Sequence, residues 1–234
     1  MQPLVYSLID KAVYDYKLIE DGDKILVGAS GGKDSTLLIE YMANRLRRPS
    51  ADFSFAALNI QSDFAPDFPE GIKSLFGQWG VDFRKIDVDI LNRLKPGRKM
   101  SCFWCSMQRR TELIRYAMAN GFNKIALGHH KDDVLETLLM NMVGKAELAT
   151  MPARLRYEKY PLEIIRPLYY INEEKIISHA KTSGYFGWTC TCGYQENSAR
   201  KDMRRRLELL TDGDENAKDR LFLSLRNINA QYLP

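Results

Sequence analysis

The chain has 234 residues, of which 45% are hydrophobic and 27% charged, and its formal net charge is +4. This length and composition predict one large domain, or one and a half domains, with a buried core, and they exclude collagen-like, low-complexity and intrinsically disordered proteins. The mild positive charge permits a nucleic-acid partner without requiring one. Because no apolar stretch is long enough to span a membrane and residues 1–10 carry no secretory signal pattern, we expect a cytoplasmic protein with no membrane partner.

Strand-like and helix-like segments alternate along the chain. Short apolar or alternating runs predict strands at residues 24–28, 53–60, 82–88, 124–127 and 162–166. Helical spacing of apolar residues predicts helices at residues 34–47, 66–79, 105–120, 132–143 and 173–183, followed by charged helical sequence from about residue 195. This alternation is typical of an α/β fold, so we expect a mainly parallel five-stranded sheet with helices on both faces. We assign residues 1–190 to this domain and residues 191–234 to a basic helical C-terminal extension packed on it.

The segment between the first strand and the first helix is rich in glycine and hydroxyl side chains. It reads Gly28-Ala29-Ser30-Gly31-Gly32-Lys33-Asp34-Ser35-Thr36. Glycines let backbone N–H groups face an anion, and a helix N-terminus together with Lys33 adds positive charge. These features predict a cradle for nucleotide phosphates, although the segment is neither a Walker A loop nor a dinucleotide-binding fingerprint.

This segment resembles the PP-loop of the N-type ATP pyrophosphatases, which has the form Ser-Gly-Gly-x-Asp-Ser. In that family the loop holds the pyrophosphate end of ATP, and the enzymes transfer AMP to a substrate oxygen. The resemblance implies ATP contacts from Ser30, Gly31, Gly32, Lys33, Asp34 and Ser35. It also places adenosine near Asn59, at the end of the second strand. Because ligands of parallel sheets bind at the carboxyl ends of the strands, we expect the loops after residues 28, 60 and 127 to line one site.

A second unusual segment follows the fourth strand. Gly128, His129 and His130 end the strand, and Asp132 and Asp133 open the next helix. Helix capping and loop hydrogen bonds are the ordinary explanation for such residues. At the carboxyl edge of the sheet, however, these carboxylates could bind Mg²⁺ or transfer a proton. We expect Gly128 and His129 to contact the nucleotide, and Asp133, or as second choice Asp132, to bind Mg²⁺ or act as acid or base.

The four cysteines occur as two pairs, Cys102 with Cys105 and Cys190 with Cys192. In a chain expected in the cytoplasm, such pairs suggest metal or redox chemistry before structural disulfides. The spacing leaves four alternatives open: a thioredoxin-like redox pair, a zinc site of four thiolates, an iron–sulfur cluster held by three thiolates, and inert thiols. It favours metal binding without choosing the metal.

Basic residues gather in clusters that border these motifs. The clusters are Arg45, Arg47 and Arg48; Arg93, Lys95, Arg98 and Lys99; Arg109 and Arg110; and Arg200, Lys201, Arg204, Arg205 and Arg206. Solvated helix faces with acidic partners are the ordinary explanation for any one cluster. Their position beside the predicted sites favours a polyanionic substrate, whose binding would weaken steeply with salt.

Taken together, the motifs resemble those of the tRNA 2-thiocytidine synthetases. The shared motifs are Ser30–Ser35, Cys102 and Cys105 with Arg109 and Arg110, Gly128–Asp133, and Ile165-Arg166-Pro167-Leu168. The similarity extends from about Ile19 to the C-terminus. That family uses ATP, Mg²⁺ and a [4Fe-4S] cluster held by three cysteines to thiolate C2 of a cytidine in the tRNA anticodon loop. Where the family usually has Cys-x-x-Cys before the later glycine, this chain has Cys190-Thr191-Cys192, and we prefer Cys190 as the third ligand.

The resemblance implies a mechanism in which the O2 atom of the cytidine attacks the α-phosphate of ATP, giving an adenylated base and pyrophosphate. Lys33 and Mg²⁺ would offset charge on the transferring phosphate. Sulfide on the iron that has no cysteine ligand would then displace AMP, with Arg109 and Arg110 between the cluster and the RNA or phosphate path. The implied partners are tRNA, a sulfur donor such as a cysteine desulfurase or free sulfide, and a second copy of the chain in a homodimer.

Two other functions fit the same residues. The first is a PP-loop ATPase that thiolates or dethiolates another base or a small molecule. The second is a non-catalytic, zinc-stabilised protein that binds RNA or nucleotides. The second predicts bound zinc, no labile sulfide and no pyrophosphate release with tRNA.

Overall fold

The computed structural model describes residues 3–48, 52–95, 97–98, 100–188 and 199–232. They fall into two compact units, one within Met1–His130 and Pro152–Gln195, the other within Lys131–Met151 and Glu196–Pro234. Each unit is considered by itself. The domain boundary predicted after residue 190 lies outside the described residues and stays a prediction.

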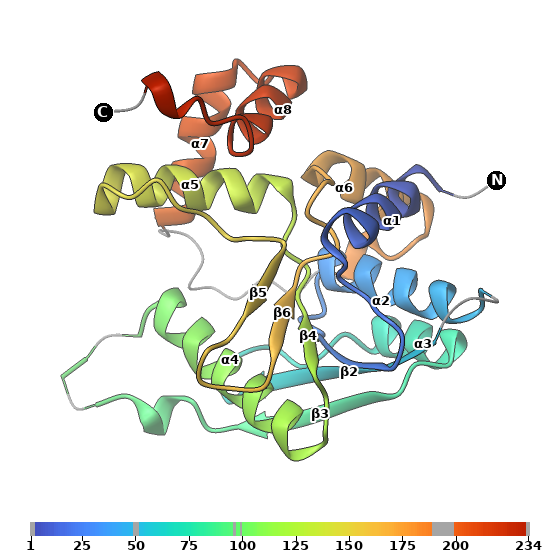
Figure 1. The fold of residues 1–234 in the computed structure, drawn as a ribbon. Coiled ribbons are helices and arrows are strands. Elements are labelled where there is room, and N and C mark those ends of the chain that lie inside the picture. Colours follow the sequence, from blue (N-terminus) through green and yellow to red (C-terminus); the bar gives the residue numbers. More distant parts are fainter. Residues whose placement is uncertain (1–2, 49–51, 96, 99, 189–198, 233–234) are drawn as a thin grey trace. The chain divides into compact units, whose positions relative to one another are not determined.

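The first unit is built around a six-stranded sheet with the strand order β3-β2-β1-β4-β6-β5 (Figure 1). The strands are β1 (Asp23–Gly28), β2 (Phe53–Ser62), β3 (Phe83–Val88), β4 (Lys124–Ala126), β5 (Arg154–Arg156) and β6 (Glu163–Ile165). Neighbouring strands are parallel except for the antiparallel pair of β5 and β6. The predicted mainly parallel sheet is therefore confirmed. It has one strand more than predicted, because β5 is too short to show a periodic pattern in the sequence.

The helices of the first unit are α1 (Leu4–Tyr16), α2 (Lys33–Leu46), α3 (Glu70–Trp79), α4 (Cys102–Ala119) and α6 (Glu173–Thr182), with short 3-10 turns η1 (Leu91–Arg93) and η2 (Phe186–Trp188). Helix α1 was not predicted, although its buried Val5, Ile9 and Val13 follow helical spacing. Helix α3 begins at Glu70 rather than at residue 66, because Pro69 occupies the cap position with extended backbone angles. Helix α4 begins at Cys102, earlier than the predicted Cys105.

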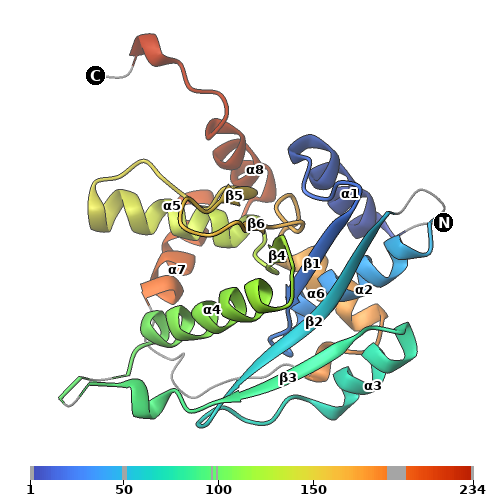
Figure 2. The same ribbon diagram turned by 60° about the horizontal axis from the view of Figure 1, so that its bottom comes forward.

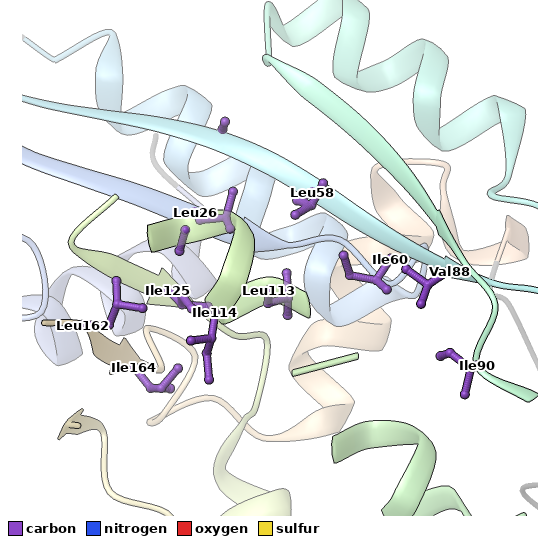
Figure 3. Close-up of a cluster of buried hydrophobic side chains, with 12 residues drawn as sticks. Leu26, Leu58, Ile60, Val88, Ile90, Leu113, Ile114, Ile125, Leu162 and Ile164 are labelled. Carbon is purple, nitrogen blue, oxygen red and sulfur yellow. The ribbon is translucent and has the colours of Figure 1, made fainter. Parts of the chain in front are cut away.

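Helices cover both faces of this sheet, as predicted. Figure 2 shows α4 on one side of the strands and α2, α3 and α6 on the other. On the α4 side, Leu113 and Ile114 of the helix join Leu26, Leu58 and Ile125 of the strands in one buried cluster (Figure 3). Burying a leucine or isoleucine side chain contributes about 1.5–3 kcal/mol, so this cluster fixes the helix on the sheet.

The second unit is helical. It contains α5 (Lys131–Lys145), α7 (Ala199–Thr211), α8 (Glu215–Ser224) and the 3-10 turn η4 (Ala230–Tyr232). Helix α5 packs against both α7 and α8. A helical C-terminal segment is therefore confirmed over its described residues. In neither unit is any described helix both long and apolar enough to cross a bilayer.

Candidate active site

The phosphate loop joins β1 to α2 through a turn that only glycine fits. Gly31 has a φ of +79°, and a Cβ atom built on it would lie 2.9 Å from Cδ of Pro69. Both the left-handed backbone and the lack of space exclude a side chain there. Gly32 then caps α2 without any side-chain hydrogen bond. Because the first N–H groups of an α-helix lack intrahelical partners, this uncapped end suits an anion such as phosphate.

Hydroxyl side chains fix the shape of the loop from within. The Ser30 N–H donates to Ser35 Oγ at 3.1 Å, and the Gly32 N–H donates to Ser30 Oγ at 3.2 Å. The hydroxyls of Ser35 and Thr36 donate to the Gly32 carbonyl at 3.1 and 3.0 Å. These bonds favour one conformation of the loop, which lowers the entropic cost of binding a ligand there.

The loop after β4 lies directly against the first turn of α2. A Cβ atom on Gly128 would be 3.0 Å from the Ser35 nitrogen and 3.1 Å from the carbonyl carbon of Asp34. Strand β4 pairs with β1, so the carboxyl ends of these two strands meet at one edge of the sheet. The expected proximity of the loops after residues 28 and 127 is therefore confirmed, and Gly128 is the residue that permits it.

Asn59 connects β2 to the same loop. Its Nδ2 donates to the Ala29 carbonyl at 2.7 Å, and the residue is 3% exposed. Its Oδ1 is buried and has no hydrogen-bond partner among the residues that the structure describes. A buried acceptor without a partner costs about 1–3 kcal/mol, so a ligand that donates an N–H there, such as the adenine amino group, would relieve that cost. These residues fit a bound adenine nucleotide.

Lys33 is held by two carboxylates. Its Nζ lies 3.2 Å from Oδ1 of Asp34 and 2.8 Å from Oε1 of Glu173, which opens α6. Burial by itself lowers the pKa of Lys33, but the carboxylates of Asp34 and Glu173 outweigh burial and raise that pKa above its ordinary value. Lys33 is therefore a permanent positive charge at neutral pH. Glu173 was missed in the sequence because no local pattern connects α6 with the phosphate loop.

The two histidines after β4 differ in their surroundings. His130 is 2% exposed, and its Nε2 lies 4.0 Å from Oδ1 of Asp34. His129, which was the expected nucleotide contact, is half-buried. The structure thus brings His130 close to an acidic residue of the phosphate loop. A nucleotide contact from His129 stays a prediction.

Asp132 and Asp133 belong to the second unit, in the first turn of α5, where the helix dipole favours a carboxylate. Asp133 Oδ1 lies 3.3 Å from a guanidinium nitrogen of Arg200, and Asp132 Oδ1 lies 3.9 Å from Nζ of Lys218. Within this unit, the helix dipole and these ion pairs stabilise both carboxylates. Their roles toward Mg²⁺ or a proton stay predictions.

A fully buried carboxylate on α5, that of Glu136, forms ion pairs with two arginines of the C-terminal basic cluster, Arg200 and Arg204. Glu136 is 0% exposed, and its Oε1 accepts from Nε of Arg204 at 2.7 Å while its Oε2 lies 3.6 Å from Nε of Arg200. Burial raises the pKa of Glu136 above its ordinary value, although Arg204 and Arg200 oppose the rise. For these two arginines the ordinary explanation, an acidic partner within the fold, is confirmed.

The first cysteine pair lies in one helical turn. Ser101 caps α4 by accepting from the Trp104 N–H at 3.2 Å, so positions 102 and 105 both fall at the N-terminus of that helix. A helix N-terminus stabilises thiolate, the form that binds metals. Cys105 is half-buried against the core cluster, and Arg109 and Arg110 follow further along α4. Cys190 and Cys192 lie outside the described residues, so the ligand set stays a prediction.

The sequence is similar to that of known proteins along nearly its whole length. Residues 7–208 match the family model of the PP-loop domain. The tRNA-cytidine(32) 2-sulfurtransferase of Methylobacillus flagellatus is 38% identical over 233 residues, which cover 97% of this chain and 76% of that protein. The protein of the same name from a Marinomonas species is 35% identical over 238 residues, which cover 100% of this chain and 85% of the relative.

Solved structures share the fold at low identity. The U34-tRNA thiolase NcsA from Methanococcus maripaludis, solved with its [4Fe-4S] cluster, has a TM-score of 0.76 at 18% identity, over 98% of this chain and 80% of that one. An NMN synthetase from Francisella tularensis has a TM-score of 0.58 at 13% identity, over 99% of this chain and 95% of that one. These likenesses concern the fold.

Proposed function

The chain belongs to the PP-loop family that includes the tRNA-cytidine(32) 2-sulfurtransferases, and from this premise we propose that it replaces the C2 oxygen of a tRNA cytidine with sulfur at the expense of ATP. The observation that carries the ATP-dependent step is the preformed phosphate loop, closed by its own hydroxyls and placed against Gly128. A cytidine in an anticodon loop is unpaired or can be flipped out, so its O2 atom is accessible to an enzyme.

ATP binding would use the described features of the loop. The backbone of Ser30–Ser35 and the uncapped start of α2 would hold the pyrophosphate end, and Lys33 would contribute the fixed charge. Asn59 Oδ1 would accept from the adenine. Mg²⁺ takes few protein carboxylates and the rest of its ligands from phosphate and water, and Asp133, or as second choice Asp132, stays our candidate for binding it or for acting as acid or base.

In the activation step, the O2 atom of cytidine attacks the α-phosphorus of ATP. A bond forms between O2 and phosphorus, the bond between the α-phosphorus and the bridging oxygen breaks, and pyrophosphate leaves with the electron pair. Lys33 stays protonated and offsets the charge that develops on the transferred phosphate and on pyrophosphate. Attack of sulfide sulfur on C2 of the adenylated base would then form the C–S bond, and the C2–O2 bond would break, so that AMP leaves with the former O2 atom.

We propose that Cys102, Cys105 and one of Cys190 and Cys192 hold a [4Fe-4S] cluster. Two thiolates at the N-terminus of one helix suit such a group, because both the helix end and the metal favour the deprotonated thiol. When bound, a cluster held by only three cysteines would supply an iron able to carry the sulfur that enters C2.

The remaining partners follow from this activity. We assign Arg109 and Arg110 to the RNA, because neither side chain has an acidic partner among the described residues and guanidinium groups bind phosphate and stack on bases. We further propose a cytoplasmic enzyme, a cysteine desulfurase or free sulfide as sulfur source, and a homodimer.

The proposal is tested by pyrophosphate release from ATP with and without unmodified tRNA, using protein purified without oxygen. We expect tRNA-dependent pyrophosphate and AMP from the wild type and a loss of at least about a hundredfold in Lys33→Met, since an electrostatic stabiliser of a transferring phosphate contributes about 2.7–4 kcal/mol. Lys73→Met, which changes an exposed lysine on α3, is the matched control. Pyrophosphate release that does not depend on tRNA would indicate another substrate. Bound zinc without any pyrophosphate release would indicate a non-catalytic binding protein.

A further inference from the structure

We propose that Glu173 is a positioning residue for ATP binding, which acts by holding the side chain of Lys33 in a single conformation before the nucleotide arrives. The proposal rests on the assignment of the phosphate loop as the ATP site. It concerns a residue that lies on α6, far from the loop in sequence, and that makes the shorter of the two ion pairs of Lys33.

The ion pair lies in a shielded position. The distance from Lys33 Nζ to Glu173 Oε1 is 2.8 Å, and the two side chains are 15% and 23% exposed. An ion pair that is largely removed from water is stronger than a surface pair and orders its partners better. Asp34, the neighbour of Lys33 in the chain, approaches the ammonium only to 3.2 Å. Glu173 therefore makes the closer of these two ion pairs, and it does so from a different helix, whereas Asp34 is the chain neighbour of Lys33.

Helix α6, which carries Glu173, is held in place near both of its ends. Asn172 caps α6 by accepting from the Lys175 N–H at 3.2 Å, and it is 2% exposed. Further along, His179 Nε2 lies 2.8 Å from Oε2 of Glu40 on α2. Helix α6 thus contacts α2 at two levels, through Glu173 with Lys33 and through His179 with Glu40. The carboxylate of Glu173 is presented by a rigid support rather than by a flexible loop.

The chemical consequence concerns the hydrogens of the ammonium. A lysine ammonium has three N–H donors on a flexible four-carbon chain. With Glu173 and Asp34 each accepting one donor, one donor stays available for a phosphate oxygen. Ordering a lysine side chain costs conformational entropy, and in this arrangement the fold has met that cost before ATP binds.

Two conservative substitutions distinguish the effect of the position of the Glu173 carboxylate from the effect of its charge. Glu173→Asp keeps the charge but withdraws the carboxylate by the length of one methylene. Glu173→Gln keeps the length and an acceptor oxygen but removes the charge. If position is what matters, Glu173→Asp raises the KM for ATP about tenfold, which corresponds to about 1.4 kcal/mol, while Glu173→Gln raises it no more than about threefold. The kcat of tRNA-dependent pyrophosphate release should fall in the same order, because a displaced Lys33 also stabilises the transferring phosphate less well.

The matched controls are Glu174→Asp and Glu174→Gln. Glu174 is the next residue in the same first turn of α6, is exposed, and has no partner among the described residues. Each control changes the helix-dipole interaction as its counterpart does, and we expect a wild-type KM from both. The dissociation constant of the non-hydrolysable analogue AMPCPP with Mg²⁺, measured by calorimetry without tRNA, should follow the order of the KM values.

The inference is overturned if Glu173→Asp leaves the KM for ATP at the wild-type value, since the position of the carboxylate would then not control Lys33. It is also overturned if either substitution tightens ATP binding, because Glu173 would then compete with phosphate for Lys33. The calorimetric measurement distinguishes failure of the proposed role of Glu173 from failure of the proposed tRNA-directed function. A wild type that binds the analogue with the expected order among variants, yet releases no pyrophosphate with tRNA, would refute the tRNA-directed function and leave the role of Glu173 standing.

Discussion

Gly128→Ala tests the geometry of the site with one added methyl group. The new Cβ would lie 3.0 Å from the Ser35 nitrogen, 3.1 Å from the Asp34 carbonyl carbon and 3.3 Å from the Asp34 oxygen. All three are backbone atoms of the first turn of α2, which cannot rotate away as a side chain can. Either that turn or the loop after β4 must move by several tenths of an ångström.

The expected cost has two parts. Overpacking of this kind destabilises a protein by about 1–3 kcal/mol, and about 2 kcal/mol corresponds to a melting temperature lower by roughly 4–8 °C in a chain of this size. The larger effect concerns ATP, because a shift of the first turn displaces Lys33 and the N–H groups that would hold the phosphates. A misplacement of about 1 Å at a reacting group costs up to about a hundredfold in rate, so we expect kcat/KM for ATP to fall about ten- to a hundredfold.

The assay is tRNA-dependent pyrophosphate release across ATP concentrations, combined with a thermal melt. Gly77→Ala is the matched control, because Gly77 lies within α3 of the same unit and a Cβ on it would meet nothing within 4 Å. That control should keep full activity and gain up to about 1 kcal/mol of stability from its better helix propensity. Wild-type kcat/KM in Gly128→Ala would refute the idea that the β4 loop sets the position of the phosphate loop.

Three further predictions follow from individual side chains. Asn59→Ala removes the buried Oδ1 acceptor, so the KM for ATP should rise about tenfold. The KM for GTP should change less, because GTP lacks the 6-amino donor, and an equal change of KM for both nucleotides would contradict an adenine contact. Because the pKa of Lys33 is raised, its side chain stays protonated until the pH exceeds that raised value. The KM of the wild type for ATP should therefore stay level from pH 7 to 9. A KM that rises steadily over this range would contradict Lys33 as the positive charge that binds the phosphates. The raised pKa of Glu136 means that its ionisation opposes folding as the pH rises, and Arg204→Leu removes its main partner. The free energy of unfolding should therefore fall more in Arg204→Leu at pH 8 than at pH 5, by a difference of about 3 kcal/mol or less, whereas an equal fall at both pH values would contradict a buried ionised carboxylate.

The sequence predicted those parts of the site that depend on neighbouring residues. The phosphate loop is recognisable because its glycines, hydroxyls and lysine all lie between one strand and one helix, and local chemistry determines its shape. The proximity of Gly128 to the loop followed from a general property of parallel sheets, since β4 lies beside β1.

Contacts between distant segments could not be predicted in the same way. Glu173 meets Lys33 only because α6 packs on α2, and a glutamate in the first turn of a helix is otherwise an ordinary dipole interaction. His130 and His129 are indistinguishable by type and position, and only the folded backbone buries His130 next to Asp34. Strand β5 is 3 residues long, so its antiparallel pairing with β6 leaves no periodic trace.

The cysteine assignment has a direct test in metal content. Protein purified without oxygen should contain about four irons with acid-labile sulfide per chain, lost in Cys102→Ala and in one of Cys190→Ala and Cys192→Ala. Loss in only one of the later pair would name the third ligand, whereas one zinc without sulfide, held by all four thiols, would contradict the cluster.

The most direct test of the central claim is nucleoside mass spectrometry of tRNA after incubation with the protein, Mg²⁺, ATP and sulfide under reducing, oxygen-free conditions. The account predicts 2-thiocytidine that requires ATP and is lost in Lys33→Met. Unchanged cytidine, while the protein consumes ATP in a tRNA-dependent manner, would contradict it and show that another base or another atom is modified.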